Sequence, residues 1–201
     1  MSSVPDRAAA FRRGHRRLGR LLLAVASEQP STRAWAVDTD GERRVGPMLD
    51  ACAGEGVCVL HERRMPDART NIDHLVVASA GVYVIDAKRY RGAVEKRDVG
   101  PWGQADERLF VGRRDRTRVV HAMGPQVAVV QAAVADEDVP VIPVLAVVDG
   151  DWGLFDRPFM LDGVLVIWAK GLPRRLRRSG PLGPRQVREI AHRLDAALPP
   201  A

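Results

Sequence analysis

Apolar residues in the first part of the chain change from a helical to a strand-like spacing. Between residues 39 and 53 they recur every three or four positions, which predicts an amphipathic helix with one buried face. The residues at this spacing are Val45, Met48, Leu49 and Cys52. Three β-branched runs, separated by turn-rich segments, follow at 57–60, 72–78 and 82–85. Such runs in close succession predict consecutive antiparallel strands.

Helical and strand-like segments alternate in the second half of the chain. Residues 125–135 predict a helix with Pro125 in its first turn, where the missing N–H costs nothing. The apolar run 141–148 is typical of a strand buried on both faces. Further expected elements are strands at 92–95, 109–114 and 164–168, a basic turn or short helix at 174–178, and a closing helix at 184–198. The order helix, three strands, helix, strand indicates an α/β fold with a mixed sheet.

Composition and charge narrow the class of protein. A chain of 201 residues with 46% hydrophobic and 28% charged residues has enough apolar side chains for one folded domain of ordinary size. The net charge of +6 and the isoelectric point near 10.1 favour an anionic partner, either nucleic acid or a membrane surface. An arginine-rich composition imposed by a GC-rich genome would give the same charge, so the charge alone leaves both explanations open.

Three regions are expected along the chain. Residues 1–37 form a basic, amphipathic appendage with a linker, and this segment could lie on nucleic acid, on a membrane surface or against the domain. Residues 38–170 form the main domain, and 171–201 a basic turn with a C-terminal helix. The longest apolar stretch near the N-terminus, 21–26, is too short to span a bilayer. Cys52 and Cys58 lack the spacing of a zinc site, which favours a reduced, cytoplasmic protein.

The most informative polar residues lie within the second and third predicted strands. Asp73 interrupts an apolar strand, and Asp86 and Lys88 end the next one. Because side chains alternate along a strand, Asp86 and Lys88 point to the same face. A two-residue turn at 80–81 would pair position 73 with 88 and bring all three side chains to one face. A three-residue turn would place Asp73 on the opposite face.

Two carboxylates beside a lysine suit the hydrolysis of phosphodiesters. The reaction needs a cation that offsets charge on the phosphate and acidifies the attacking water. Mg²⁺ or Mn²⁺ takes oxygen ligands, which Asp73, Asp86 and the backbone carbonyl of Ala87 would supply. Lys88 would orient or deprotonate the water. The alternative for Asp86 and Lys88 is an exposed ion pair at a strand end, worth about 0 to 1 kcal/mol.

Other polar residues are candidates for supporting roles. Glu42 lies on the inward edge of the first predicted helix and could bind the metal, although with Thr39 it also forms the pattern of a capping box. Arg89 and Arg91 flank the predicted site and could hold phosphates of nucleic acid. The histidines show no metal-ligand spacing and are expected to be packed. The tryptophans Trp102, Trp152 and Trp168 could stack on bases, but core or edge packing is the commoner role.

Several segments together resemble the nuclease-related domain (NERD) family, which is similar to the PD-(D/E)XK endonuclease superfamily. They are residues 39–42, 71–74 and 81–92, and the likeness continues from the helix around Gln126 to about residue 170. The resemblance implies a restriction-endonuclease-like αβββαβ core. It also implies a catalytic set, which consists of Glu42, Asp73, Asp86, Lys88 and Gln126, with Gln131 as the alternative glutamine. Asp86 occupies a position where glutamate is more frequent in the superfamily. Because the side chain of aspartate is one methylene shorter, the metal would have to lie closer to the strand.

The sequence therefore predicts a Mg²⁺-dependent endonuclease that acts on nucleic acid, with DNA as the expected substrate. A second hypothesis is a regulatory or nucleic-acid-binding module that keeps the fold and cuts nothing. A third is a protein docked on a membrane surface by residues 7–26.

Overall fold

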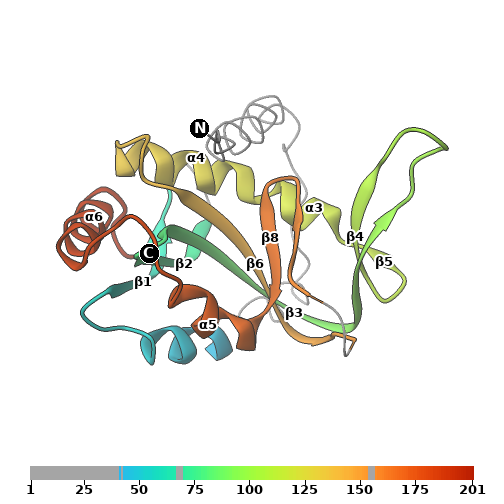
Figure 1. Ribbon diagram of the computed structural model, residues 1–201, viewed down its shortest axis with the longest axis horizontal. Coiled ribbons are helices and arrows are strands. Elements are labelled where there is room, and N and C mark those ends of the chain that lie inside the picture. Colours follow the sequence, from blue (N-terminus) through green and yellow to red (C-terminus); the bar gives the residue numbers. More distant parts are fainter. Residues whose placement is uncertain (1–40, 42, 67–69, 154–156) are drawn as a thin grey trace, which may run out of the picture.

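In the part of the chain that the computed structural model describes, residues 41, 43–66, 70–153 and 157–201, six of the eight strands form a mixed main sheet with helices on both faces, and the other two extend from one of these six (Figure 1). The predicted appendage 1–37 and Glu42 lie outside the described residues. No helix in the described ranges is long and apolar enough to cross a membrane.

The strands follow the spatial order β1-β2-β3-β6-β8-β7. Their bounds are β1 Val57–Arg64, β2 Asn71–Ala78, β3 Gly81–Asp98, β6 Val141–Asp151, β7 Phe159–Leu161 and β8 Val164–Trp168. β1, β2 and β3 are antiparallel, β3, β6 and β8 are parallel, and β7 returns antiparallel to β8. β6 is buried between two neighbours, which explains its continuous apolar run. The predicted α/β fold with a mixed sheet is confirmed.

β3 is much longer than the sequence predicted, and it carries a second, smaller sheet. The strand segments expected at 92–95 and 109–114 are present, but the first is a continuation of β3 through a bulge between Arg89 and Gly92, which then pairs with β4 Glu107–Val111. β5 Arg114–Asp115 completes this sheet, which projects from the main one (Figure 1). Trp102 lies in the loop between β3 and β4 and is fully exposed, so the expected packing role is wrong for this residue.

Helices cover both faces of the main sheet (Figure 1). α3 Thr117–His121, α4 Met123–Val134 and α6 Pro184–Ala197 pack on one face, here called the α4 face. The helix that includes residues 43–50 and α5 Leu172–Leu176 pack on the other, here called the α5 face, and a 3₁₀ turn, Ala169–Gly171, precedes α5. Val45 and Leu49 of the first helix are completely buried, as the helical spacing predicted. A buried leucine of this kind contributes about 1.5–3 kcal/mol.

The turn between β2 and β3 differs by one position from the prediction. It consists of Ser79 and Ala80, and Ala78 pairs with Gly81. Contacts with a distant segment determine this position: the Ser79 hydroxyl accepts a hydrogen bond from the Gly180 N–H (3.1 Å), and the Ser79 carbonyl accepts one from the Leu182 N–H (3.0 Å). Position 73 therefore lies opposite 86 rather than 88. A shift of two residues does not change the face that strict alternation would give Asp73, although the regular pairing ends at His74.

The C-terminal residues pair with the edge strand β1. The Arg64 N–H donates to the Pro199 carbonyl (2.9 Å), and the Ala201 N–H donates to the Glu62 carbonyl (2.8 Å). Arg63 and Pro200 form an antiparallel bridge between these two bonds. The outer edge of β1 is thus covered over these residues.

Candidate functional site

The predicted site lies where β2 separates from β3. Regular pairing of these strands ends at His74 and Ile85. One residue further along, the Asp73 carboxylate replaces the backbone as acceptor and takes a hydrogen bond from the Ala87 N–H (3.1 Å). This bond holds the Asp73 carboxylate beside the peptide that joins Asp86 to Ala87. The two predicted acids therefore approach the same peptide unit from neighbouring strands.

The Ala87 carbonyl opens toward the same gap between the strands. The N–H and C=O of one strand residue point to the same side of the strand, so this carbonyl also faces β2, which no longer pairs with it. Gly41 packs directly against it, because a Cβ built on Gly41 would lie 2.7 Å from the carbonyl oxygen. Glycine is required for this close approach. The chain next to Glu42 thus reaches the site, although Glu42 itself lies outside the described residues.

Asp86 and Lys88 form a buried ion pair on the α4 face. They follow Val82 and Val84, which belong to the core on that face, at the same alternation. Lys88 Nζ lies 2.7 Å from Asp86 Oδ1, and the two side chains are only 14% and 7% exposed. The alternative of an exposed ion pair is therefore wrong. The angles of this contact are not those of a hydrogen bond, and Asp86 Oδ1 accepts none from the described residues.

Gln126 lies on the sheet-facing side of α4. It is three residues after Met123 and four before Val130, both of which are buried against the sheet. Its Oε1 is buried without a hydrogen bond from the described residues. Gln131, the alternative glutamine, is exposed. Of the two glutamines, Gln126 is the one that the fold directs toward the face on which Asp86 and Lys88 lie.

The donors gathered here suit a hard divalent cation. The carboxylates of Asp73 and Asp86 and the carbonyl of Ala87 are oxygen donors of the kind that Mg²⁺ or Mn²⁺ binds. Asp86 Oδ1 already has an ammonium partner in Lys88 Nζ, 2.7 Å away, so a cation would share this carboxylate with Lys88. Among the described residues, no group of three His, Cys, Asp or Glu side chains could hold a metal. A site built from them would combine Asp73, Asp86 and the Ala87 carbonyl.

Arg89 and Arg91 surround a carboxylate that sequence reasoning did not select. Arg89 lies on the α5 face, opposite to Lys88, and its Nε donates to Asp149 Oδ2 (2.7 Å). Arg44 donates to the other oxygen of Asp149 (2.9 Å). These hydrogen bonds and charges, together with the charge of Arg91, hold the pKa of Asp149 below its usual value. No local pattern marks Asp149, because its partners come from distant parts of the chain.

A pair of histidines lies beside the site on the α5 face. His61 Nδ1 and His74 Nδ1 are 2.8 Å apart, and His61 Nε2 lies 2.8 Å from Asp50 Oδ1. Burial and the neighbouring His61 lower the pKa of His74 to about 4, against a weaker opposing effect of Asp50. The prediction that His74 is packed and hydrogen-bonded is confirmed. The contact of His61 with His74 can be predicted from the sequence only if the register of β1 and β2 is already known.

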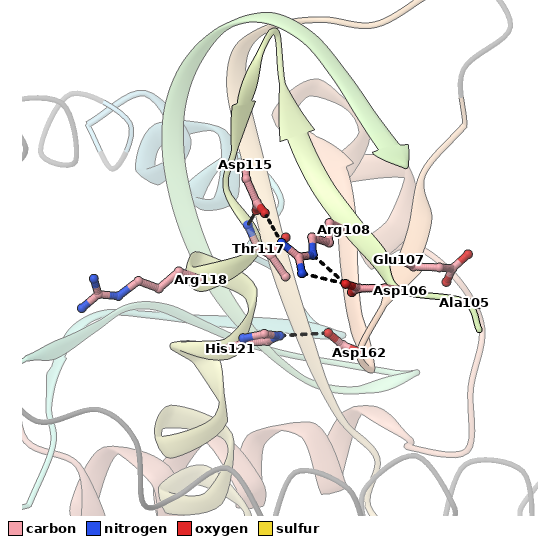
Figure 2. A pocket seen from close by; sticks show the side chains of 9 residues that line it. All are labelled: Ala105, Asp106, Glu107, Arg108, Asp115, Thr117, Arg118, His121 and Asp162. Carbon is pink, nitrogen blue, oxygen red and sulfur yellow. Dashed lines mark hydrogen bonds and ion pairs between the residues drawn. The ribbon is translucent and has the colours of Figure 1, made fainter. Parts of the chain in front are cut away.

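A polar pocket lies away from the predicted site residues. Figure 2 shows this pocket, of about 660 Å³, between the β4–β5 hairpin, α3 and the turn before β8. Its four acids are already in ion pairs with nearby cations: Asp106 and Asp115 with Arg108, Asp162 with His121, and Glu107 with Lys96. Each acid of the pocket thus contacts a basic side chain, and none of the predicted site residues lines it.

Comparison with known proteins gives one positive result. Residues 38–148, more than half of the 201, match the family described as the nuclease-related domain. The matched range includes the β2–β3 gap and α4, hence every candidate catalytic residue. Searches of curated proteins and of solved structures returned no significant match.

Proposed function

Since the chain belongs to the nuclease-related domain family, we propose that it is a PD-(D/E)XK-type nuclease, which hydrolyses phosphodiester bonds in DNA with the help of Mg²⁺ or Mn²⁺. The observation that carries the proposal is the hydrogen bond from the Ala87 N–H to Asp73, which holds the Asp73 carboxylate beside the peptide that joins Asp86 to Ala87. The buried Asp86–Lys88 pair adds an ammonium group at the same place.

Asp73, Asp86 and the Ala87 carbonyl would hold the cation, with Glu42 as an auxiliary acid. When bound, a divalent cation of this kind offsets negative charge on the phosphate and lowers the pKa of a nearby water. Lys88 Nζ, next to Asp86, would orient the attacking water and donate to a phosphate oxygen. Gln126 would position the same water or the phosphate from α4. Arg89 and Arg91 would bind the phosphate backbone beside the cut.

A cleavage assay with metal control tests the proposal. Wild-type protein is incubated with labelled DNA in Mg²⁺, in Mn²⁺ and in excess chelator, and it should cut only with metal. Asp86→Asn and Lys88→Gln each remove one charge at the site with little change in shape, so the rate should fall at least about 100-fold. Asp162→Asn serves as the matched control, because it removes an ion-paired carboxylate in the other pocket. Equal cutting by wild type and both site variants would refute the proposal.

Titration of metal separates the nuclease from a module that only binds nucleic acid. Calorimetry with Mg²⁺ or Mn²⁺ should give a binding signal for the wild type and none for Asp86→Asn. A protein that shifts DNA on a gel but shows neither metal binding nor cleavage would be the non-catalytic module instead.

A further inference from the structure

A second cavity opens at the carboxyl ends of the parallel strands. Its volume is about 610 Å³, and the side chains that define its character are Arg44, Met48, Asp149, Trp152, Trp168 and Lys170. The two indole rings meet edge to face, with ring centroids 5.4 Å apart. Trp168 of β8 pairs with Val147 of β6, and Val147 in turn pairs with Lys88 of β3. The cavity is therefore two strands away from the candidate metal site, along the same end of the sheet.

Two cationic residues, Arg44 and Lys170, line this cavity, and Arg89 contacts its carboxylate, Asp149. One Asp149 carboxylate bridges two guanidinium groups, with one oxygen to Arg44 and the other to Arg89. Arg44 gives Asp149 one of its five N–H donors. Lys170 adds an exposed ammonium group on the other side of the cavity. Cations thus outnumber the carboxylate, and the carboxylate fixes the position of two of them.

Aromatic walls beside fixed guanidinium groups match the two parts of a nucleotide. Indole and thioether groups offer an apolar surface on which a base can stack, and arginines bind a phosphate in a fork geometry. A base that is paired in a duplex cannot enter a cavity, so the occupant must be unpaired. A lipid chain would contact the apolar walls, but it would make no use of arginines that a carboxylate holds at fixed positions.

We infer that this cavity receives an unpaired base of a nucleic-acid strand, and that the adjoining phosphate lies on Arg44 and Arg89. The inference deepens the proposed nuclease function and rests on it, because it takes the strand that enters the cavity to be the substrate. Arg89 immediately follows Lys88 in β3, so the strand would pass from the catalytic face across the end of the sheet into the cavity. The substrate class is then single-stranded nucleic acid, or a duplex with an unpaired end.

Binding in chelator, where nothing is cut, tests the inference. Fluorescence anisotropy of the full chain is measured with a twelve-residue oligothymidylate, with an abasic oligomer of equal length, and with a blunt duplex. The wild type should bind oligothymidylate more tightly than the abasic oligomer or the duplex. Trp168→Ala should weaken binding of oligothymidylate by roughly 5- to 150-fold and leave the abasic oligomer unchanged.

Two further variants are needed. One tests the cations at the rim, and the other replaces Trp168→Ala if that variant does not fold. Arg44→Ala should weaken binding of both single strands and reduce the slope of log affinity against log salt by about 0.7. Its matched control is Arg185→Ala, an exposed arginine of α6 that pairs with Glu189. If Trp168→Ala does not fold, Trp168→Phe should keep tight binding of oligothymidylate while the quenching of tryptophan fluorescence on binding decreases.

Equal wild-type affinity for oligothymidylate and the abasic oligomer would overturn the inference, as would wild-type binding by Arg44→Ala. Cleavage assays in Mg²⁺ are scored separately. Binding that depends on the base without any cleavage would refute the nuclease proposal and leave the cavity as a base-binding site. Cleavage without dependence on the base would refute only the present inference.

Discussion

Acidification should destabilise this protein through His74. The side chain is only 3% exposed, and burial together with His61 lowers its pKa from 6.5 to about 4. Its ring contacts His61, which in turn contacts Asp50 of the first helix. Protonation of His74 would place a positive charge in a buried position next to the His61 ring.

The sign and size of the effect follow from the two pKa values. The unfolded chain takes up a proton near pH 6.5, whereas the folded protein resists it until about pH 4, so stability is greatest above pH 6.5 and falls between these values. One pKa unit corresponds to about 1.4 kcal/mol, so the loss of unfolding free energy from this residue is about 2 kcal/mol at pH 5 and about 3 kcal/mol at pH 4. Most carboxylates titrate below pH 5, so the range from pH 7 to 5 separates the titration of histidines from that of carboxylates.

Urea denaturation followed by circular dichroism at pH 7, 6 and 5 measures this loss directly. His74→Gln cannot be protonated, and its unfolding free energy should change much less between pH 7 and 5 than that of the wild type. His192→Gln, an exposed histidine of α6, is the matched control and should behave like the wild type. A His74→Gln variant with the full wild-type dependence on pH would show that another group is responsible.

Three further changes test other parts of the structure. Gly41→Ala places a methyl group against the Ala87 carbonyl and should cost about 1–3 kcal/mol of unfolding free energy, whereas Gly124→Ala, whose added methyl group meets nothing within 4 Å apart from its chain neighbours, should cost much less in the same urea assay. Mg²⁺ or Mn²⁺ at 100 times its dissociation constant should raise wild-type stability by about 2.7 kcal/mol, and an equal rise in the melting temperature of Asp86→Asn would contradict the assigned ligands. Trp102→Ser removes a fully exposed ring and should change the unfolding free energy by less than about 0.5 kcal/mol; a larger loss would mean that this indole packs against the protein.

Local sequence patterns were sufficient to predict the main helices and strands and to select the residues of the candidate site. The apolar spacing around Leu49 and the β-branched runs before Asp73 and Asp86 reflect burial of one helix face and of alternate strand positions, which the fold retains. The shared face of Asp73, Asp86 and Lys88 followed from alternation, since a shift of two residues does not change it.

What the sequence could not supply depends on contacts between distant segments. The register of β2 and β3 is fixed by the contacts of Ser79 with the chain around Gly180. The bridge from Arg44 to Arg89 through Asp149 joins three separate elements. Burial of the Asp86–Lys88 pair depends on helices that pack over the strand end. The sequence Asp86-Ala87-Lys88 alone does not contain this information.

The pairing of Pro199 to Ala201 along β1 has a consequence for how copies of the protein can meet. An open strand edge offers a row of unpaired backbone groups to which another chain can add, and this is a common route to aggregation. Here two prolines, which cannot donate a backbone hydrogen bond, lie along one edge, and the opposite edge is the three-residue strand β7. Sheet-to-sheet polymerisation is therefore disfavoured at both ends, and self-association would have to use helices, loops or the projecting hairpin.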